Sequence, residues 1–230
     1  MAVISAFDVL GPNMIGPSSS HTAGAVAIAL LAQKMIAGQI IEAEFTLYGS
    51  FSRTYRGHGT DRALLGGIMG FKTDDRRIRD SFSIAQQRGL RYSFLTNEKD
   101  KDVHPNTVDI RMTCLNGRTF SVRGESLGGG KVRISRIDHI DVDFSGEYST
   151  LIIIHHDRLG VLAHITRCLS EGYVNIAFMK LFRETKGDRA YSIIEFDGSL
   201  PDHMVSRIYE NPDVQDVMFI PVKGENENGF

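Results

Sequence analysis

Tryptophan is absent from this sequence and cysteine is scarce, with only Cys114 and Cys168 among 230 residues. Two cysteines so far apart are too few for a disulfide framework, a zinc site or a complete set of cluster-binding thiolates. A long apolar run is also missing: the sequence has no stretch of about 18 apolar residues, the length needed to span a bilayer. It also does not begin with a basic segment followed by apolar residues, which is the pattern of a signal peptide. We therefore expect a protein of the reducing cytoplasm.

Neither sign of charge is in excess, since 26 Lys and Arg residues stand against 28 Asp and Glu residues, a formal net charge of −2. No cluster of Lys and Arg indicates a surface for nucleic acid or membrane. Hydrophobic residues make up 42% of the chain and charged residues 23%, which is typical of a globular protein, and the length allows two modest domains. We expect small metabolites as ligands, with no nucleic acid and no membrane.

A hydroxyl-rich loop precedes the first predicted helix. Residues 16–24 read Gly-Pro-Ser-Ser-Ser-His-Thr-Ala-Gly, and the apolar run that begins at residue 25 favours a helix to about residue 38. The N-terminus of a helix presents unpaired N–H groups and the positive end of the helix dipole, so a carboxylate or phosphate is its natural ligand. A cap needs one hydroxyl, whereas this loop has four beside the imidazole of His21. The pattern therefore predicts a binding loop.

A second histidine lies at the start of a second predicted helix. A strand pattern over residues 43–48 leads into the loop 53–61. In this loop His58 stands between two glycines, and Thr60 or Asp61 is expected to cap the helix that follows. A lone histidine between glycines is more often a turn residue than a catalyst, so the loop alone leaves the role of His58 open.

The rest of the first half alternates helices and strands. Helical spacing indicates a short segment at 6–10 and a helix that ends at Gly89. Strand alternation with core positions is found at residues 90–94, 108–114, 120–122, 132–137 and 140–144. Asn116-Gly117 is a two-residue hairpin signal, and Cys114 is expected to be buried with its strand face. The triple glycine 128–130 is either a flexible turn or a close approach of the backbone to a ligand or partner chain.

A polar segment at 145–147 is expected to join two domains, 1–145 and 148–223. The second has strands and helices in the order βαββαβ, at residues 150–155, 161–170, 174–183, 190–196, 201–209 and 214–221. This order is that of a split ferredoxin-like unit, so we expect an α+β protein. His155 and His156 are adjacent on a strand and should point to opposite faces, one packed and one solvated. Cys168 shares its helix with core residues and should be buried.

These motifs carry a resemblance to a known family. The string 16–24 resembles the signature of the iron–sulfur-dependent L-serine dehydratases, or L-serine deaminases, and residues 57–61 are similar to a second motif of these enzymes. The length and layout resemble the separate beta chain of the two-subunit form, and His104 and the triple glycine resemble family features too. The resemblance implies a mixed α/β substrate-binding-type domain over 1–145, and a lyase that converts L-serine to pyruvate and ammonia in serine catabolism and gluconeogenesis.

The same resemblance implies a [4Fe-4S] cluster that the alpha chain ligates, with no metal ligand in this chain, and a monovalent cation such as potassium in some members. It assigns His21 and His58 as catalytic residues, and leaves open which of them is the base. The expected substrate-binding residues are Ser18, Ser19, Ser20, Thr22 and Thr60. The expected partners are the alpha chain and L-serine.

The second domain resembles an ACT domain. Its loop between the first strand and the first helix reads Asp-Arg-Leu-Gly-Val-Leu over residues 157–162. In ACT domains this loop binds an amino acid at an interface between two domains, which implies self-association. The residues expected to contact an effector are Asp157, Gly160, Val161 and Leu162.

Other functions remain open at this point. A related N-terminal domain paired with ACT occurs in some phosphoglycerate dehydrogenases as a serine sensor, so residues 18–21 could bind an effector and perform no chemistry. A stand-alone hydrolase is disfavoured, because Ser19 and Ser20 lie too close in sequence to His21 for the usual triad and no nucleophile-elbow pattern is present. A nucleic-acid binder lacks both the charge and the motifs.

Overall fold

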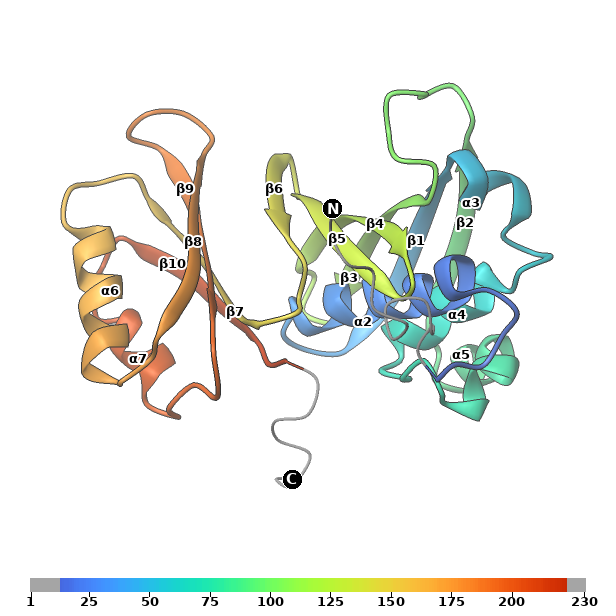
Figure 1. Cartoon of the computed structure of the whole chain (residues 1–230), viewed down its shortest axis with the longest axis horizontal. Helices are drawn as coiled ribbons and strands as arrows, with labels where there is room; N and C mark the ends of the chain where they lie inside the picture. The colour runs from blue at the N-terminus through green and yellow to red at the C-terminus, as the bar shows by residue number, and fades with distance from the viewer. Residues whose placement is uncertain (1–12, 223–230) are drawn as a thin grey trace, which may run out of the picture. The chain divides into compact units, whose positions relative to one another are not determined.

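In the computed structural model of the chain, residues 13–222 are described, and the chain divides into two compact units, Met1–Ser145 and Gly146–Phe230 (Figure 1). Each unit is built on its own sheet. The short helical segment expected at 6–10 lies outside the described residues. Within residues 13–222, no helix is both long enough and apolar enough to cross a membrane.

The first unit holds a six-stranded sheet in the order β2-β1-β3-β4-β5-β6. Its strands are β1 (Ile40–Tyr48), β2 (Arg91–Asn97), β3 (Thr107–Cys114), β4 (Thr119–Gly128), β5 (Lys131–Ile137) and β6 (Ile140–Phe144). Strands β1 and β2 are parallel, and all other neighbours are antiparallel. The helical segments are η1 (Ser19–Ala23), α2 (Gly24–Lys34), α3 (Gly49–Thr54), α4 (Thr60–Ile68), η2 (Arg76–Asp80) and α5 (Ser81–Gln87).

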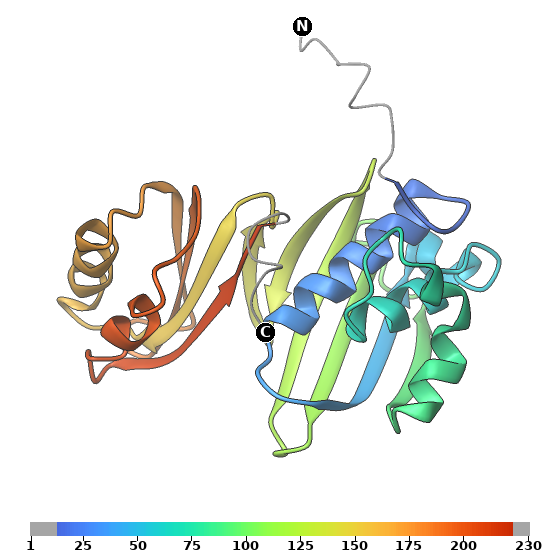
Figure 2. The ribbon, with the colours of Figure 1, turned by 90° about the horizontal axis from the view of Figure 1, so that it is seen from below.

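Helix α2 lies across one face of this sheet and packs against α4 (Figure 2). Small residues allow the close approach, because a side chain at Gly124 of β4 would overlap Ile28, and one at Gly67 of α4 would overlap Ala29. Most of α2 is therefore buried. The expected alanine-rich helix is confirmed, although it ends at Lys34 and not near residue 38.

The alternation expected for the central strands is confirmed. In β3, Val108, Ile110, Met112 and Cys114 are all buried on one face. The Asn-Gly signal forms the turn between β3 and β4, where Gly117 has a φ of 81°. The triple glycine forms the turn between β4 and β5, with φ values of 96°, 61° and 81° that favour glycine.

The core positions expected at residues 90–94 are wrong in part. Leu90 is buried, but Tyr92 is 37% exposed and Phe94 is only half-buried. The physical reason is that β2 is an edge strand that pairs with β1 alone, so neither of its faces is fully covered. Alternation reports the strand, but it does not report the place of the strand in the sheet.

The second unit is a ferredoxin-like βαββαβ structure, as expected. Its elements are β7 (Ser149–His156), α6 (Val161–Glu171), β8 (Ile176–Arg183), β9 (Arg189–Phe196), α7 (Met204–Ile208) and β10 (Val214–Ile220). The sheet order is β10-β7-β9-β8, with every neighbouring pair antiparallel. Both helices lie on the same side of this sheet (Figure 1). The α+β fold class is confirmed.

The core of the second unit lies between the helices and the sheet, and includes Leu151, Ile153, Val161, Ile165, Cys168, Leu169, Ile194 and Phe196. Burial of Cys168 is therefore confirmed. His155 is buried and its Nε2 lies 2.9 Å from Ser192 Oγ, whereas His156 is more exposed. The opposite orientation of these two histidines follows from the two-residue period of a strand.

Candidate functional site at the N-terminus of α2

The loop before α2 ends in a capped, widened helical turn. Ser18 has an extended backbone, and its Oγ accepts a hydrogen bond of 3.1 Å from the His21 N–H. Residues Ser19–Ala23 then form a π-helical turn, in which the Gly24 N–H donates to the Ser19 carbonyl. Such turns are rare and are frequently found at functional sites. The sequence expectation of a serine cap at a helix N-terminus is confirmed.

His21 has a hydroxyl at each ring nitrogen. Its Nδ1 lies 3.1 Å from Ser20 Oγ and 3.4 Å from Ser18 Oγ, and its Nε2 lies 2.9 Å from Ser50 Oγ. The ring also packs edge-on against Phe51, with 5.4 Å between centroids. Partial burial lowers the pKa of His21, and the positive charge that His58 can carry lowers it further. The ring of His21 is therefore held neutral and in a defined orientation.

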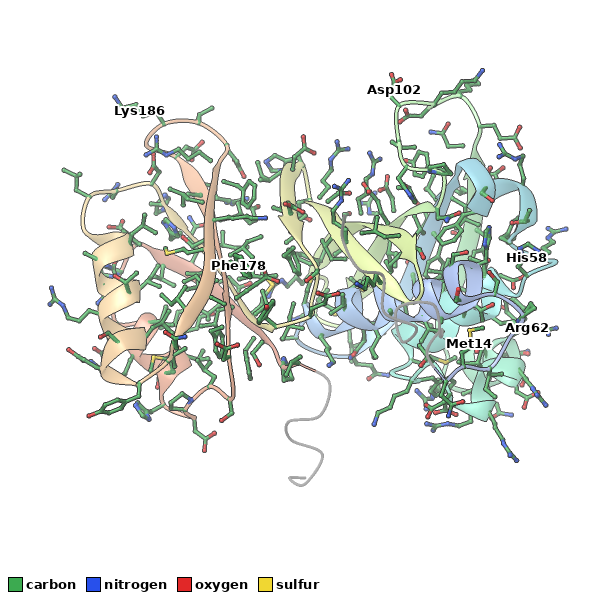
Figure 3. All side chains as sticks on the ribbon, in the orientation of Figure 1. Met14, His58, Arg62, Asp102, Phe178 and Lys186 are labelled. Atoms are coloured by element: carbon green, nitrogen blue, oxygen red, sulfur yellow. The ribbon has the colours of Figure 1, made fainter. Side chains whose placement is uncertain are left out.

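His58 lies beside His21, with 4.8 Å between the ring centroids and an interplanar angle of 81°. It belongs to the turn between α3 and α4 (Figure 3). The His58 N–H donates to the Thr54 carbonyl at 3.0 Å, and the His58 carbonyl accepts from Thr22 Oγ1 at 3.0 Å. The Thr22 bond joins the two loops that sequence analysis singled out, and brings both histidines into one site.

The imidazole of His58 is less engaged than that of His21. Its Nδ1 is buried without a hydrogen-bond partner, and its Nε2 has no partner within residues 13–222. The ring itself is half-buried. Of the two histidines, His58 is the one whose ring nitrogens have no hydrogen-bond partner within residues 13–222.

Two expectations about the second loop are wrong. Arg53 and Thr54 belong to helix α3, so the loop is shorter than 53–61. Neither Thr60 nor Asp61 caps α4, because Gly59 occupies the cap position with a φ of 68° and no side chain contributes a cap bond. A glycine that can adopt this left-handed conformation replaces the side-chain cap. Burial raises the pKa of the Asp61 carboxyl.

Of the five expected substrate contacts, four lie in one turn and the fifth is separate. Ser18, Ser19 and Ser20 are half-buried at the start of the helix, and Thr22 is buried beneath them against His58. Thr60 is fully buried in the first turn of α4, and its Oγ1 has no hydrogen-bond partner. The assignment of these five residues to a substrate stays a prediction.

Ser50, the second residue after strand β1, was not predicted to belong to the site. Gly49 has a φ of 50°, and a side chain there would overlap Pro105, with 2.6 Å from its Cβ to the Pro105 carbonyl oxygen. The Ser50 N–H donates to the same carbonyl at 2.6 Å. The only sequence signal was a Gly-Ser pair at the end of a strand, and nothing in it points to His21.

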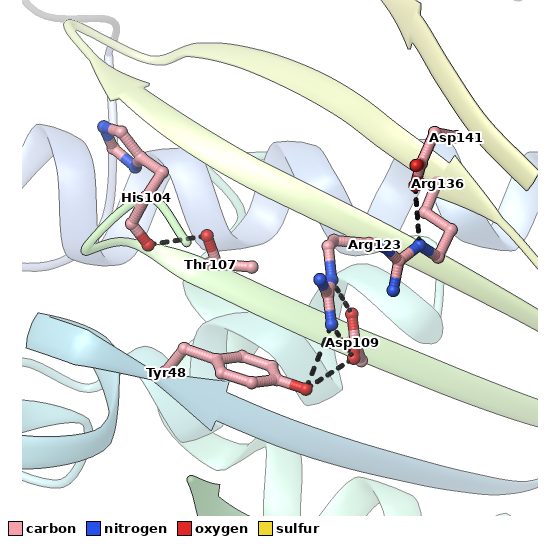
Figure 4. Close-up of polar contacts among 7 residues, drawn as sticks. All are labelled: Tyr48, His104, Thr107, Asp109, Arg123, Arg136 and Asp141. Carbon is pink, nitrogen blue, oxygen red and sulfur yellow. Dashed lines mark hydrogen bonds and ion pairs between the residues drawn. The ribbon is translucent and has the colours of Figure 1, made fainter. Parts of the chain in front are cut away.

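The segment that begins at His104 forms another wall of the site. His104 Nδ1 accepts from the Asn106 N–H at 3.2 Å, and the His104 carbonyl accepts from Thr107 Oγ1 at 2.6 Å (Figure 4). The Asn106 carbonyl in turn accepts from the Ser126 N–H at 2.9 Å. Within the described part of the chain, no hydrogen bond joins His104 to His21 or His58. His104 is therefore not part of the hydrogen-bonded group around His21.

Ser126 completes the enclosure of the α2 N-terminus. It is fully buried, and a side chain at Gly24 would come within 2.0 Å of its Oγ. The buried polar atoms without a hydrogen-bond partner include four from this region, namely His58 Nδ1, Thr60 Oγ1, Asn106 Oδ1 and Ser126 Oγ. Most buried polar atoms in proteins have partners, so this concentration distinguishes the region from the rest of the unit.

No group of three or more His, Cys, Asp or Glu within residues 13–222 is arranged to hold a metal ion. Cys114 lies at the end of β3 in the first unit, and Cys168 lies in α6 of the second. Both thiols are buried, and this burial raises the pKa of each. Each unit therefore has a single cysteine, so neither unit by itself supplies the thiolates that an iron–sulfur cluster needs.

On the sheet face away from α2, Tyr48, Asp109 and Arg123 form a hydrogen-bonded group (Figure 4). Arg123 binds both Asp109 oxygens, at 2.6 and 2.7 Å, and Tyr48 OH donates to Asp109 Oδ2 at 2.7 Å. Burial and this carboxylate raise the pKa of Tyr48. The group anchors the end of β1, one residue before Gly49.

The expected effector loop of the second unit lies between β7 and α6. Gly160 caps α6 with a φ of 87°, and a side chain there would meet open space. Val161 is part of the core and Leu162 packs against it. Asp157 is already engaged, since its Oδ2 accepts from the Gly187 N–H at 3.0 Å and from Arg183 Nε at 3.1 Å. Its carboxylate ties the loop to the β8–β9 hairpin.

Fold and site together define an α+β protein that joins a two-histidine, hydroxyl-lined site to a ferredoxin-like unit. The family described as serine dehydratase beta chain matches residues 5–136. The "L-serine dehydratase, beta chain" of Peptoniphilus asaccharolyticus is 41% identical over 208 residues, which cover 90% of this chain and 94% of that protein. The chain belongs to the serine dehydratase beta chain family.

Two further relatives come from Bacillus subtilis (strain 168). A "Probable L-serine dehydratase, beta chain" is 36% identical over 210 residues, covering 91% of this chain and 94% of that protein. A "D-3-phosphoglycerate dehydrogenase" is 27% identical over 160 residues, covering 69% of this chain but only 30% of that protein.

Proposed function

We propose that this chain is the beta subunit of an L-serine dehydratase and that, together with an alpha chain, it converts L-serine to pyruvate and ammonia. The names of the two relatives that match over nearly their whole length support the subunit and the substrate. The observation that carries the proposal is the pair of histidines, 4.8 Å apart, beside a hydroxyl-lined helix N-terminus.

The helix N-terminus suits the carboxylate of serine. Ser18 and Ser20 lie at the opening of the turn, where their hydroxyls and the positive end of the α2 dipole favour an anion. Holding the carboxylate there would orient the substrate with its α-hydrogen toward the histidine pair. Orientation of this kind contributes to catalysis because the reacting groups no longer have to find one another.

His58 is the proposed base. Both nitrogens of His21 are engaged by hydroxyls, whereas those of His58 have no partner within residues 13–222. His58 would take the α-proton, the electrons of the C–H bond would form the Cα=Cβ bond, and the β-hydroxyl would leave with its own electron pair. The aminoacrylate then becomes an imine, and water hydrolyses it to pyruvate and ammonia.

The cluster implied by the resemblance does not fit the ligands of this chain. A [4Fe-4S] cluster commonly requires four cysteine thiolates, and this chain has two, both buried and one in each unit. The alpha chain is therefore the proposed carrier of the cluster, which would supply a Lewis acid for the leaving hydroxyl. No step assigned to the residues of this chain depends on its geometry.

Co-expression with the alpha chain tests the catalytic proposal. His58→Ala is expected to lower the turnover of serine by about 10²- to 10⁴-fold, because it removes the base. His21→Ala should lower the turnover as well, because it removes the ring that packs against His58 and holds it in place. His203→Ala is the matched control, since this exposed histidine lies in the second unit. Near-normal pyruvate production by both site variants, with intact cluster absorbance, would overturn the assignment.

A regulatory function is the second candidate, and the match to a phosphoglycerate dehydrogenase favours it. In that case, the same turn would bind an amino acid and perform no chemistry. The two functions differ in one measurement: a purely regulatory chain binds serine, but neither it nor its complex with the alpha chain releases pyruvate.

The second unit is proposed to be an ACT domain that binds an amino-acid effector and associates with a second copy. Its βαββαβ order and the open space at Gly160 support this proposal. The free N–H groups at the start of α6 would receive the effector carboxylate. Asp157 would then shape the loop through its bonds to Gly187 and Arg183, and would not have to contact the effector directly.

A further inference from the structure

Ser50 is bound to His21 from a different part of the fold. Ser18 and Ser20 lie in the same turn as His21, so they move with it. Ser50 is 29 residues away along the chain, at the start of α3, and its Oγ lies 2.9 Å from His21 Nε2. It is the contact in this group that fixes the ring relative to the sheet.

The backbone of Ser50 is itself held from both sides. Its N–H donates to the Pro105 carbonyl at 2.6 Å, and its carbonyl accepts from Thr54 Oγ1 at 2.8 Å. The residue before it, Gly49, fits against Pro105 only because it has no side chain. Tyr48 is anchored in turn by Asp109 and Arg123 on the other face of the sheet. The backbone that carries the Ser50 hydroxyl is therefore held in place where β1 ends and α3 begins.

We propose that Ser50 is a positioning residue, which fixes the rotation of the His21 ring and thereby the edge that His21 turns toward His58. An imidazole with a hydroxyl at each nitrogen cannot flip without breaking contacts on both sides. Without Ser50, the His21 ring keeps hydrogen-bond contacts only with Ser18 and Ser20 of its own turn, and its packing against Phe51 and His58 sets no hydrogen-bond direction. The kinetic part of this inference rests on the proposed function, while the part that concerns the ring does not.

Nitrogen-15 NMR of the full-length chain measures the ring directly, with His21 assigned by the loss of its signals in His21→Gln. In the unmodified chain, the Nε2 signal of His21 should carry the shift of a hydrogen-bonded nitrogen. Ser50→Ala should move this signal, because Nε2 loses its hydrogen bond. Ser52→Ala is the matched control: it removes a hydroxyl from the same helix, where Ser52 Oγ donates to the Gly49 carbonyl and does not contact His21.

An isosteric pair guards against a variant that fails to fold. Threonine and valine at position 50 have the same shape, and only threonine keeps the hydroxyl. Ser50→Thr should therefore preserve the shifts of His21, whereas Ser50→Val should move the Nε2 signal. In the complex with the alpha chain, Ser50→Val should lower kcat by about 10- to 100-fold relative to Ser50→Thr, with a smaller change in KM. Identical His21 shifts in Ser50→Val and Ser50→Thr would overturn the inference. A complex that makes no pyruvate even without substitutions would overturn the proposed function, and the NMR comparison would still decide the role of Ser50.

Discussion

At the scale of the residue, His21 and His58 differ although both follow from similar local sequence. Each lies in a short loop before a helix, yet His21 is bound by hydroxyls on both sides and His58 is not. The difference depends on Ser50, a residue from a third segment. The chemistry of a histidine is therefore decided by which neighbours reach its two nitrogens.

His21 should make the stability of the chain sensitive to acid. Folding lowers the pKa of His21 below its usual value of 6.5, through burial and then through His58. The unfolded chain consequently binds more protons once the pH falls toward and below 6.5, so this contribution to the free energy of unfolding is complete above that pH and is lost as the pH falls. Urea unfolding between pH 5 and 8 should show a weaker pH dependence for His21→Gln than for the unmodified chain. The exposed His203→Gln serves as the control, and an equal slope for all three proteins would contradict the assignment.

At the scale of the element, α2 is central to the first unit, because it packs against both the sheet and α4. Alanine and glycine dominate its buried surface, so the larger Ile28 carries much of its contact with β4. The same helix also orients the π-helical turn at its start. Its packing and the geometry of the site are therefore coupled.

Ile28→Ala should lower the free energy of unfolding by about 2–5 kcal/mol, since it removes a fully buried side chain that fills the space above Gly124. Leu31→Ala is the matched control on the same helix, because Leu31 is partly exposed and should cost less. Urea denaturation measures both losses, provided that the dependence of the free energy of unfolding on urea concentration has the same slope in the variants as in the unmodified chain. Equal losses for the two variants would mean that Ile28 does not carry the contact.

Elements also show where local signals compete. The alternation of residues 90–94 is real, but β2 lies at the edge of the sheet and leaves Tyr92 exposed. Thr60 and Asp61 at the start of α4 have side chains suited to capping, but the residue at the N-cap position is Gly59, in a left-handed conformation. The exposure of Tyr92 and the glycine cap of α4 both depend on how neighbouring elements pack, and the local sequence pattern carries no information about this packing.

At the scale of the whole molecule, the chain has two units with separate sheets, and we propose a separate function for each, a reacting site in the first and a sensor in the second. The first unit holds the two histidines and the hydroxyl-lined turn. The second has a ferredoxin-like fold, which by itself supports many functions. Its function therefore has to be tested at its own loop.

Gly160→Val should remove effector binding, because a branched side chain both fills the open space before α6 and disfavours the φ of 87°. Calorimetric titration of the full chain with each proteinogenic amino acid gives the readout. Gly198→Val is the matched control, since Gly198 has a similar φ of 79° with open space around it but lies after β9. A heat of binding that persists in Gly160→Val would come from another site. If no amino acid gives a heat of binding that is lost in Gly160→Val, the sensor proposal is refuted.

The features that could be predicted from the sequence are those that depend on near neighbours along the chain. These include the serine cap at Ser18, the burial of alternate residues in β3, the Asn-Gly turn and the βαββαβ order of the second unit. Each follows from capping, side-chain period or turn chemistry within a few residues. The motif over residues 16–24 also pointed to the family that residues 5–136 match.

Only the tertiary structure decided which distant groups meet. The contact of Ser50 with His21, the fit of Gly49 against Pro105 and the closeness of Ser126 to Gly24 all join segments that are far apart in the chain. Asp157 likewise turned out to be engaged by the β8–β9 hairpin. Such contacts depend on strand order and helix packing, and these arise when apolar surfaces from the whole unit are buried together.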